Sequence, residues 1–193
     1  MCPEDAPSGY TFSAMNCPVC KTVALEPATL EANLTASTCG NCGGHWISGK
    51  EYWKWMDVHG ENLPERLPAG DEPEVHDAAG PKICPEDGHF LRAYRTGHDL
   101  DFDLDHCAAC YGVWFDKNEW EVLKGRNLQD DVHYFFSEAY QKGIFKEEQA
   151  AARRKALAEK FGEQDFAEIL RIKRWIDGHP KRRELFAFLL NEV

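Results

Sequence analysis

Six of the eight cysteines in this 193-residue chain occur in Cys-x-x-Cys pairs, a spacing typical of metal binding. The first two pairs form the pattern C-x2-C-x18-C-x2-C. A two-residue gap lets one tight turn direct two thiolates at a single tetrahedral ion. We therefore predict a zinc site, rather than two unrelated redox dithiols, at Cys17, Cys20, Cys39 and Cys42.

The same pattern recurs 68 residues further along the chain. Cys39 corresponds to Cys107 and Cys42 to Cys110. A glycine and a tryptophan follow each pair at the same spacing: Gly44 and Trp46 in the first copy, Gly112 and Trp114 in the second. Cys84 corresponds to Cys17 if the second copy has one extra residue in its hairpin. The chain therefore contains two copies of one small metal module, and we predict two zinc ions per chain.

The second copy lacks one cysteine, because Asp87 stands at the position of Cys20. A carboxylate can bind zinc, but the imidazole of His89 is the better match for a site rich in thiolates. We expect His89 to complete the site formed by Cys84, Cys107 and Cys110, with Asp87 as the alternative. Cys2 is a third candidate for this fourth ligand.

Both copies share a longer signature. It runs from Cys-Pro through a hairpin to Cys-x-x-Cys-x-Gly-x-Trp, and then to a turn and a helix, over residues 17–56 and 84–124. The second copy, CAACYGVWFDKNEWEVL, continues with Trp114, Phe115, Asp116 and Glu119, whereas the first has Ser48 at the acidic position. This signature resembles the TFIIB-type zinc-ribbon family of bacterial proteins. The resemblance implies structural zinc on a small β-hairpin module and no particular enzymatic activity.

The rest of the chain indicates an α+β protein with a helical C-terminal part. Leu100, Phe102 and Leu104 alternate with aspartates, and this pattern predicts a half-buried strand over 98–105. Helix-forming residues and an apolar periodicity predict a helical bundle in the tail. We divide the chain as follows: an N-terminal segment 1–16, a first ribbon 17–56, an acidic Pro/Gly linker 57–81, a second ribbon 82–126 and a helical tail 127–193.

Charge is unevenly distributed. The formal net charge is −11. Residues 1–80 carry −8, residues 81–127 carry −3, and residues 128–193 are neutral. This net negative charge argues against nucleic-acid binding over the whole surface. No apolar run is long enough to span a membrane, and the N-terminus lacks the apolar stretch of a signal peptide, so we expect a cytoplasmic protein.

No catalytic signature appears, since G-x-S-x-G, Walker A, H-E-x-x-H and dinucleotide motifs are all missing. We expect a non-catalytic zinc-binding adaptor whose tail binds a protein partner or a second copy of the chain. Ten aromatic residues in the tail support that interpretation. A nucleic-acid-binding, transcription-related role is the alternative. It rests on the family resemblance and on two basic clusters, at 153–155 and 181–183.

Overall fold

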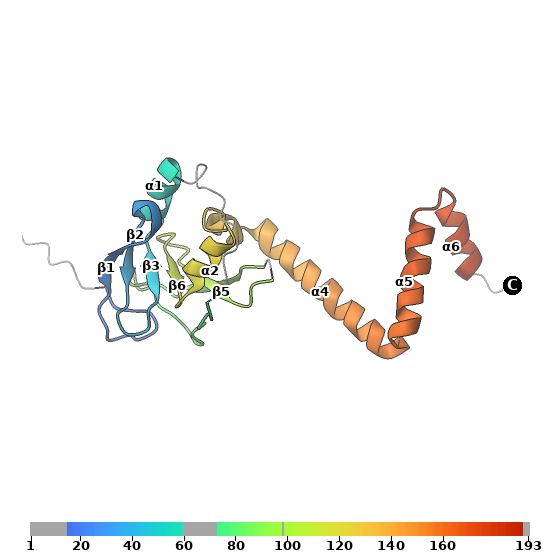
Figure 1. Cartoon of the computed structure of the whole chain (residues 1–193), viewed down its shortest axis with the longest axis horizontal. Coiled ribbons are helices and arrows are strands. Elements are labelled where there is room, and N and C mark those ends of the chain that lie inside the picture. Colours follow the sequence, from blue (N-terminus) through green and yellow to red (C-terminus); the bar gives the residue numbers. More distant parts are fainter. Residues whose placement is uncertain (1–14, 60–72, 98, 191–193) are drawn as a thin grey trace, which may run out of the picture. The chain divides into compact units, whose positions relative to one another are not determined.

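The computed structural model describes residues 15–59, 73–97 and 99–190 (Figure 1). It divides the chain into two units that meet between Gln141 and Lys142. The first unit holds both cysteine repeats, and the second holds helices. The expected fold class is confirmed, because the protein mixes helix and sheet and has a helical C-terminal region.

Each repeat contributes three antiparallel strands and one helix to the first unit. The first repeat contains β1 (Glu26–Thr29), a 3-10 turn (Glu31–Asn33), β2 (Thr35–Thr38), β3 (His45–Ile47) and α1 (Gly49–His59). The second repeat contains β4 (Arg92–Arg95), β5 (Asp103–His106), β6 (Val113–Phe115) and α2 (Glu119–Gly125). The strand predicted over 98–105 is observed as β5, which is shorter than expected and ends directly before Cys107.

The two repeats share a single six-stranded sheet with the order β1-β2-β3-β6-β5-β4. β3 and β6 pair antiparallel at its centre, where Trp46 lies opposite Trp114. The two predicted ribbon modules are thus joined edge to edge in one sheet. An isolated ribbon would leave an edge strand with unpaired backbone groups, and pairing β3 with β6 satisfies that edge in both repeats.

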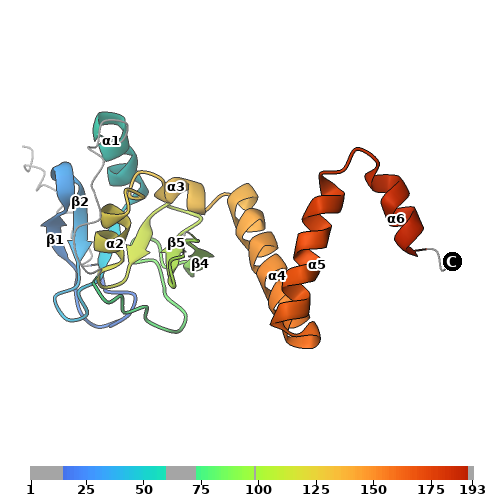
Figure 2. The same cartoon turned by 45° about the vertical axis from the view of Figure 1, so that its right-hand side comes forward.

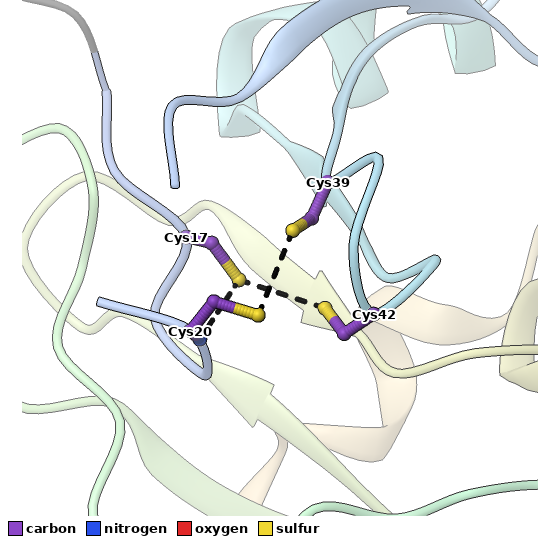
Figure 3. Close-up of side chains that lie close together, drawn as sticks. All are labelled: Cys17, Cys20, Cys39 and Cys42. Carbon is purple, nitrogen blue, oxygen red and sulfur yellow. Dashed lines mark hydrogen bonds between the residues drawn. The ribbon is translucent and has the colours of Figure 1, made fainter. Parts of the chain in front are cut away.

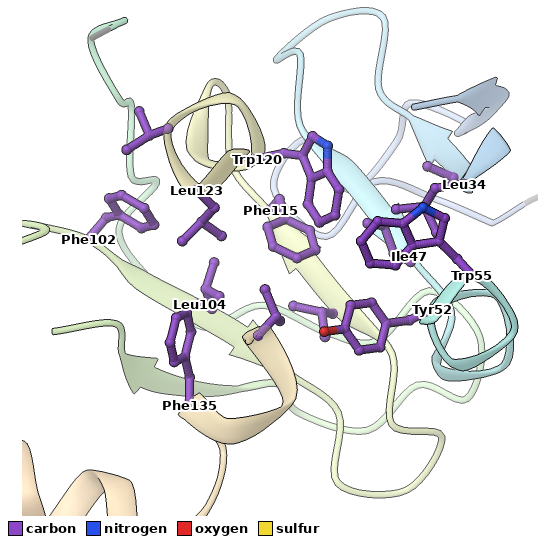
Figure 4. Packing of buried hydrophobic residues seen from close by; sticks show 14 residues of the cluster. Leu34, Ile47, Tyr52, Trp55, Phe102, Leu104, Phe115, Trp120, Leu123 and Phe135 are labelled. Atoms are coloured by element: carbon purple, nitrogen blue, oxygen red, sulfur yellow. The ribbon is translucent and has the colours of Figure 1, made fainter. Parts of the chain in front are cut away.

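The hydrophobic core on one face of the sheet draws on both repeats. Ile47 on β3 and Phe115 on β6 are fully buried, and the helices cover them with aromatic side chains (Figure 4). Trp120 of α2 makes edge-to-face contacts with Phe115 at 5.3 Å and with Trp55 of α1 at 6.0 Å between ring centroids. Because side chains alternate between the faces of a strand, Trp46 and Trp114 belong to the opposite face.

The start of the expected tail belongs to the first unit. Helix α3 (Val132–Phe135) follows α2 along the chain (Figure 2). Its Val132 and Phe135, which are 0% and 1% exposed, pack in the same core as Leu104 of β5. The hydroxyl of Tyr52 donates hydrogen bonds to the carbonyls of Gln129 and Asp130, at 3.3 and 3.0 Å. The boundary expected at residue 127 therefore moves to 141, because these residues complete the ribbon core.

The end of the expected linker also contacts the second ribbon. His76 forms a β-bridge with Lys117, and the side-chain amide of Asn118 donates to the carbonyl of Glu74 at 2.7 Å. Its beginning, residues 57–59, is part of α1. Residues 60–72 lie outside the described part of the chain, as do residues 1–14 with Cys2.

The second unit contains most of α4 (Glu138–Phe161) together with α5 (Glu163–Asp177) and α6 (Arg182–Leu190). The helical tail is thus confirmed, but a bundle with its own core is not what the structure shows. None of the described residues of α4 and α6 is buried, and Ile176 is the one buried hydrophobic residue of α5. Among the described helices, none has the length and apolar character needed to cross a membrane.

Candidate metal centres

The four cysteines of the first repeat converge on one point (Figure 3). The Sγ atoms of Cys17 and Cys42 are 3.6 Å apart, and those of Cys20 and Cys39 are 3.8 Å apart. Four sulfurs bound at ~2.3 Å to one tetrahedral ion stand about 3.8 Å from one another. The cluster therefore has the dimensions of a four-thiolate zinc site, as predicted.

Local turns produce this convergence. In the second pair of the first repeat, the amide of Gly43 donates to the carbonyl of Cys39, and the amide of Cys39 donates to the carbonyl of Gly44, both at 2.9 Å. Gly43 has a φ of +76°, the left-handed conformation that closes such a turn. The same two bonds recur from Tyr111 to Cys107 and from Cys107 to Gly112, both at 2.9 Å. The repeated sequence therefore folds into a repeated knuckle.

The thiols need a cation before all of them can ionise. Burial raises the pKa of Cys17 above its usual range and that of Cys42 to about 11. Burial also opposes ionisation of Cys39, but hydrogen bonds from the backbone of Cys42 and Asn41 and from neighbouring thiols lower its pKa to about 7. Zinc binds the thiolate form, so a divalent ion supplies the charge that stabilises four thiolates together.

The second repeat builds an equivalent cluster from Cys84, Asp87, Cys107 and Cys110. The Sγ atoms of Cys84 and Cys110 are 3.5 Å apart, and Oδ2 of Asp87 lies 3.3 Å from Sγ of Cys107. A hydrogen bond from the amide of His89 holds the pKa of Asp87 well below its usual range. The carboxylate is therefore ionised and can act as the fourth ligand. The donor sets of the two clusters fit two zinc ions.

The expectation that His89 completes this site differs from the structure. Its side chain is 67% exposed, and its Nδ1 lies 3.1 Å from Oδ1 of Asp87 instead of among the sulfurs. The carbonyl of His89 accepts a hydrogen bond from the amide of Cys84 at 2.8 Å. That bond ends the knuckle before residue 89, so Asp87 takes the place that Cys20 has in the first repeat. His89 contacts the ligand and does not replace it.

Two tryptophans connect the clusters across the sheet. Trp46 and Trp114 are 1% and 0% exposed and pack in one group with cysteines of both repeats. A Cβ atom built on Gly112 would lie 2.1 Å from Cζ2 of Trp46, and one built on Gly44 would lie 2.3 Å from Cζ2 of Trp114. Each indole thus lies against the knuckle glycine of the other repeat. The Gly-x-Trp part of the motif therefore positions the two ribbons against each other.

A buried ion network, which no spacing or motif in the sequence predicts, also supports the second ribbon. Nζ of Lys82, which is 5% exposed, lies 2.5 Å from Asp105 and 2.8 Å from Asp116. Asp116 also accepts a hydrogen bond from Nε1 of Trp114 at 2.7 Å. Asp77, Asp116 and Glu119 form a third group with the spacing of metal ligands, but the ammonium of Lys82 already supplies a positive charge there. We interpret this group as structural.

Glu119 is the most perturbed member of that network. Its side chain is 1% exposed, and Oε2 accepts a hydrogen bond from the amide of Asp116 at 2.7 Å. Burial and the nearby Asp116 carboxylate raise the pKa of Glu119 to about 9. Glu119 is therefore protonated at neutral pH and begins α2 as a neutral side chain.

Comparison with known families agrees with this geometry. The model of the transcription factor zinc-finger family, the TFIIB-type zinc ribbon, matches residues 16–58 and again residues 83–126. No match to the chain is found among curated proteins or among solved structures. The protein therefore carries two tandem TFIIB-type zinc ribbons, which together span a little under half of the chain.

Proposed function

We propose that the protein is a non-catalytic zinc-binding adaptor in which a rigid pair of ribbons carries a helical tail that binds a protein partner. The observation that carries this proposal is the exposure of large hydrophobic side chains in the tail. Nine of them gather in the described residues after Gln141: Phe145, Phe161, Ile169, Ile172, Trp175, Phe186, Phe188, Leu189 and Leu190. Exposed apolar surface that a chain does not cover itself is typical of an interaction site.

The geometry of the clusters supports a structural role for zinc. Four cysteines fill the tetrahedral positions of the first site, and no position remains for water or substrate. Cys17 and Cys39 are 1% and 0% exposed, so solvent has little access to these two thiolates, while Cys20 and Cys42 are partly exposed. Asp87 occupies the fourth position of the second site. Both sites therefore favour holding the ribbons together over hydrolytic chemistry.

A nucleic-acid-binding role is the second candidate, and the family description favours it. The basic clusters Arg153–Lys155 on α4 and Lys181–Arg183 at the start of α6 add support. Residues 81–127, which hold the second ribbon, carry a net charge of −3, which repels phosphates, whereas the first ribbon, residues 17–56, is neutral with three basic and three acidic residues. A gel-shift titration with DNA and RNA at several salt concentrations tests this role. Binding that weakens steeply with salt would favour it over the adaptor.

The adaptor role is tested by retention of native-lysate proteins on the immobilised full chain. The test variant is Trp175→Ser with Phe188→Ser, two tail aromatics that are 57% and 67% exposed. Phe90→Ser is the matched control, because Phe90 is 73% exposed but lies in the first unit. We expect the wild type and the control to retain a set of proteins, which can include further copies of this chain. The test variant should not retain that set. An identical set on all three would contradict the proposal.

A further inference from the structure

We infer that helix α5 of one copy pairs antiparallel with α5 of a second copy of this chain. This inference rests on the proposed function, since it names the partner that the tail binds. Two observations support it. The chain leaves an apolar stripe on α5 uncovered, and the charges of two α5 helices complement each other only when the helices are antiparallel.

The uncovered stripe runs along one side of α5. Ile169, Ile172 and Trp175 are 44%, 41% and 57% exposed and follow one another at three-residue spacing. Residues three apart are neighbours on the surface of a helix, so these side chains form a continuous apolar surface. Ile176, four residues after Ile172 on the same side of the helix, is 3% exposed. The stripe is therefore covered at Ile176 and open at Ile169, Ile172 and Trp175, and this open part has the composition of a helix-helix contact.

The charges of α5 separate along its length. Its first half carries Glu163, Asp165 and Glu168 and no basic residue. Its second half carries three basic residues and one acidic residue: Arg171, Lys173, Arg174 and Asp177. A parallel pair would place like charges side by side, whereas an antiparallel pair places each acidic half beside a basic half. Charge complementarity therefore selects the antiparallel orientation.

A two-fold axis near Ile169 gives the pairing its register. Asp165 and Lys173 are equally far from Ile169 along the helix, so Asp165 of each copy comes level with Lys173 of the other. Phe166 comes level with Ile172 in the same way. The contact is then isologous, with each surface meeting its own copy, as in most two-fold homodimers.

The ion pairs already present on α5 do not oppose this arrangement. Arg171 pairs with Glu168 at 2.6 Å and Lys173 with Asp177 at 2.5 Å, and all four side chains are solvent-exposed. Exposed pairs of this kind contribute little to stability and exchange readily. The helix also has four acidic and three basic residues, so an anionic nucleic acid or membrane surface is a poorer partner for α5 than a second copy.

Sedimentation velocity of the zinc-loaded full chain over a wide concentration range tests the inference. We expect a monomer–dimer equilibrium. Asp165→Lys alone and Lys173→Glu alone should each weaken it about tenfold, because each places like charges together twice in the dimer. The double variant, Asp165→Lys with Lys173→Glu, should restore it. Lys155→Glu, the same charge change at an exposed position of α4, is the matched control and should leave the equilibrium unchanged.

Two results would overturn the inference. A wild-type chain that stays monomeric at every concentration excludes a stable pair. A dimer that ignores the single charge changes, or that the double variant does not restore, excludes this helix and orientation. Helical circular dichroism of every variant shows whether α5 itself is intact. A monomer whose tail still retains lysate proteins leaves the adaptor role standing, whereas a monomer that retains none defeats both proposals.

Discussion

The reciprocal contact between glycine and tryptophan predicts how one methyl group should affect the ribbon pair. In Gly44→Ala, the new Cβ would lie 2.3 Å from Cζ2 of Trp114 and 3.0 Å from the carbonyl oxygen of Phe115. In Gly112→Ala, it would lie 2.1 Å from Cζ2 of Trp46. Carbon atoms in ordinary contact are ~3.5–4.0 Å apart, so each indole has to move by more than 1 Å.

The size of the effect follows from the burial of the two rings. Trp46 and Trp114 are 1% and 0% exposed and pack among the cysteines, so displacing either one disturbs a filled interior. Overpacking of this kind costs about 1–3 kcal/mol. We expect each alanine variant to lower the free energy of unfolding by that amount.

Urea unfolding of the zinc-loaded full chain, followed by tryptophan fluorescence, measures the change. Gly40→Ala is the matched control, because Gly40 lies in the first knuckle with nothing within 4 Å of an added Cβ, and it should change stability by less than about 0.5 kcal/mol. Zinc content should stay the same in all variants. If Gly44→Ala and Gly112→Ala were as stable as Gly40→Ala, the interlocked packing of the ribbons would be refuted.

Three further outcomes are expected. Asp87→Cys should tighten zinc at the second site in a chelator competition, because thiolates suit zinc better than carboxylates, and Cys20→Asp should weaken the first site in the same assay. The wild-type chain should lose stability as pH rises, and Glu119→Gln should abolish this pH dependence. The folded chain keeps the Glu119 proton up to about pH 9 while the unfolded chain releases it near 4.5, so urea unfolding should show the wild type weakening relative to the variant across that window. In the Cys39→Ser variant, both ribbons should be destabilised and should unfold together in one thermal transition, because their knuckles share one packed cluster. Two separate thermal transitions in this variant would contradict that coupling.

The metal clusters show which site residues local sequence can predict. A Cys-x-x-Cys pair and its following glycine form a knuckle through bonds between residues only a few positions apart, such as Gly43 to Cys39. The first site was therefore predictable, and its convergence is confirmed. The fourth ligand of the second site depended on whether the turn ended at Asp87 or reached His89. Both residue types bind zinc, so composition alone could not separate them.

The sequence by itself determined the two repeats, their metal chemistry and the helical character of the tail, because each depends on residue type and short spacing. Only the tertiary structure decided that β3 and β6 join the ribbons into one sheet, and that Val132 and Phe135 complete its core. It also decided that the helices after Gln141 leave their apolar faces open instead of forming a bundle. These features depend on which surfaces meet across long stretches of chain. Apolar periodicity shows that a face must be covered, and it does not show which surface covers it.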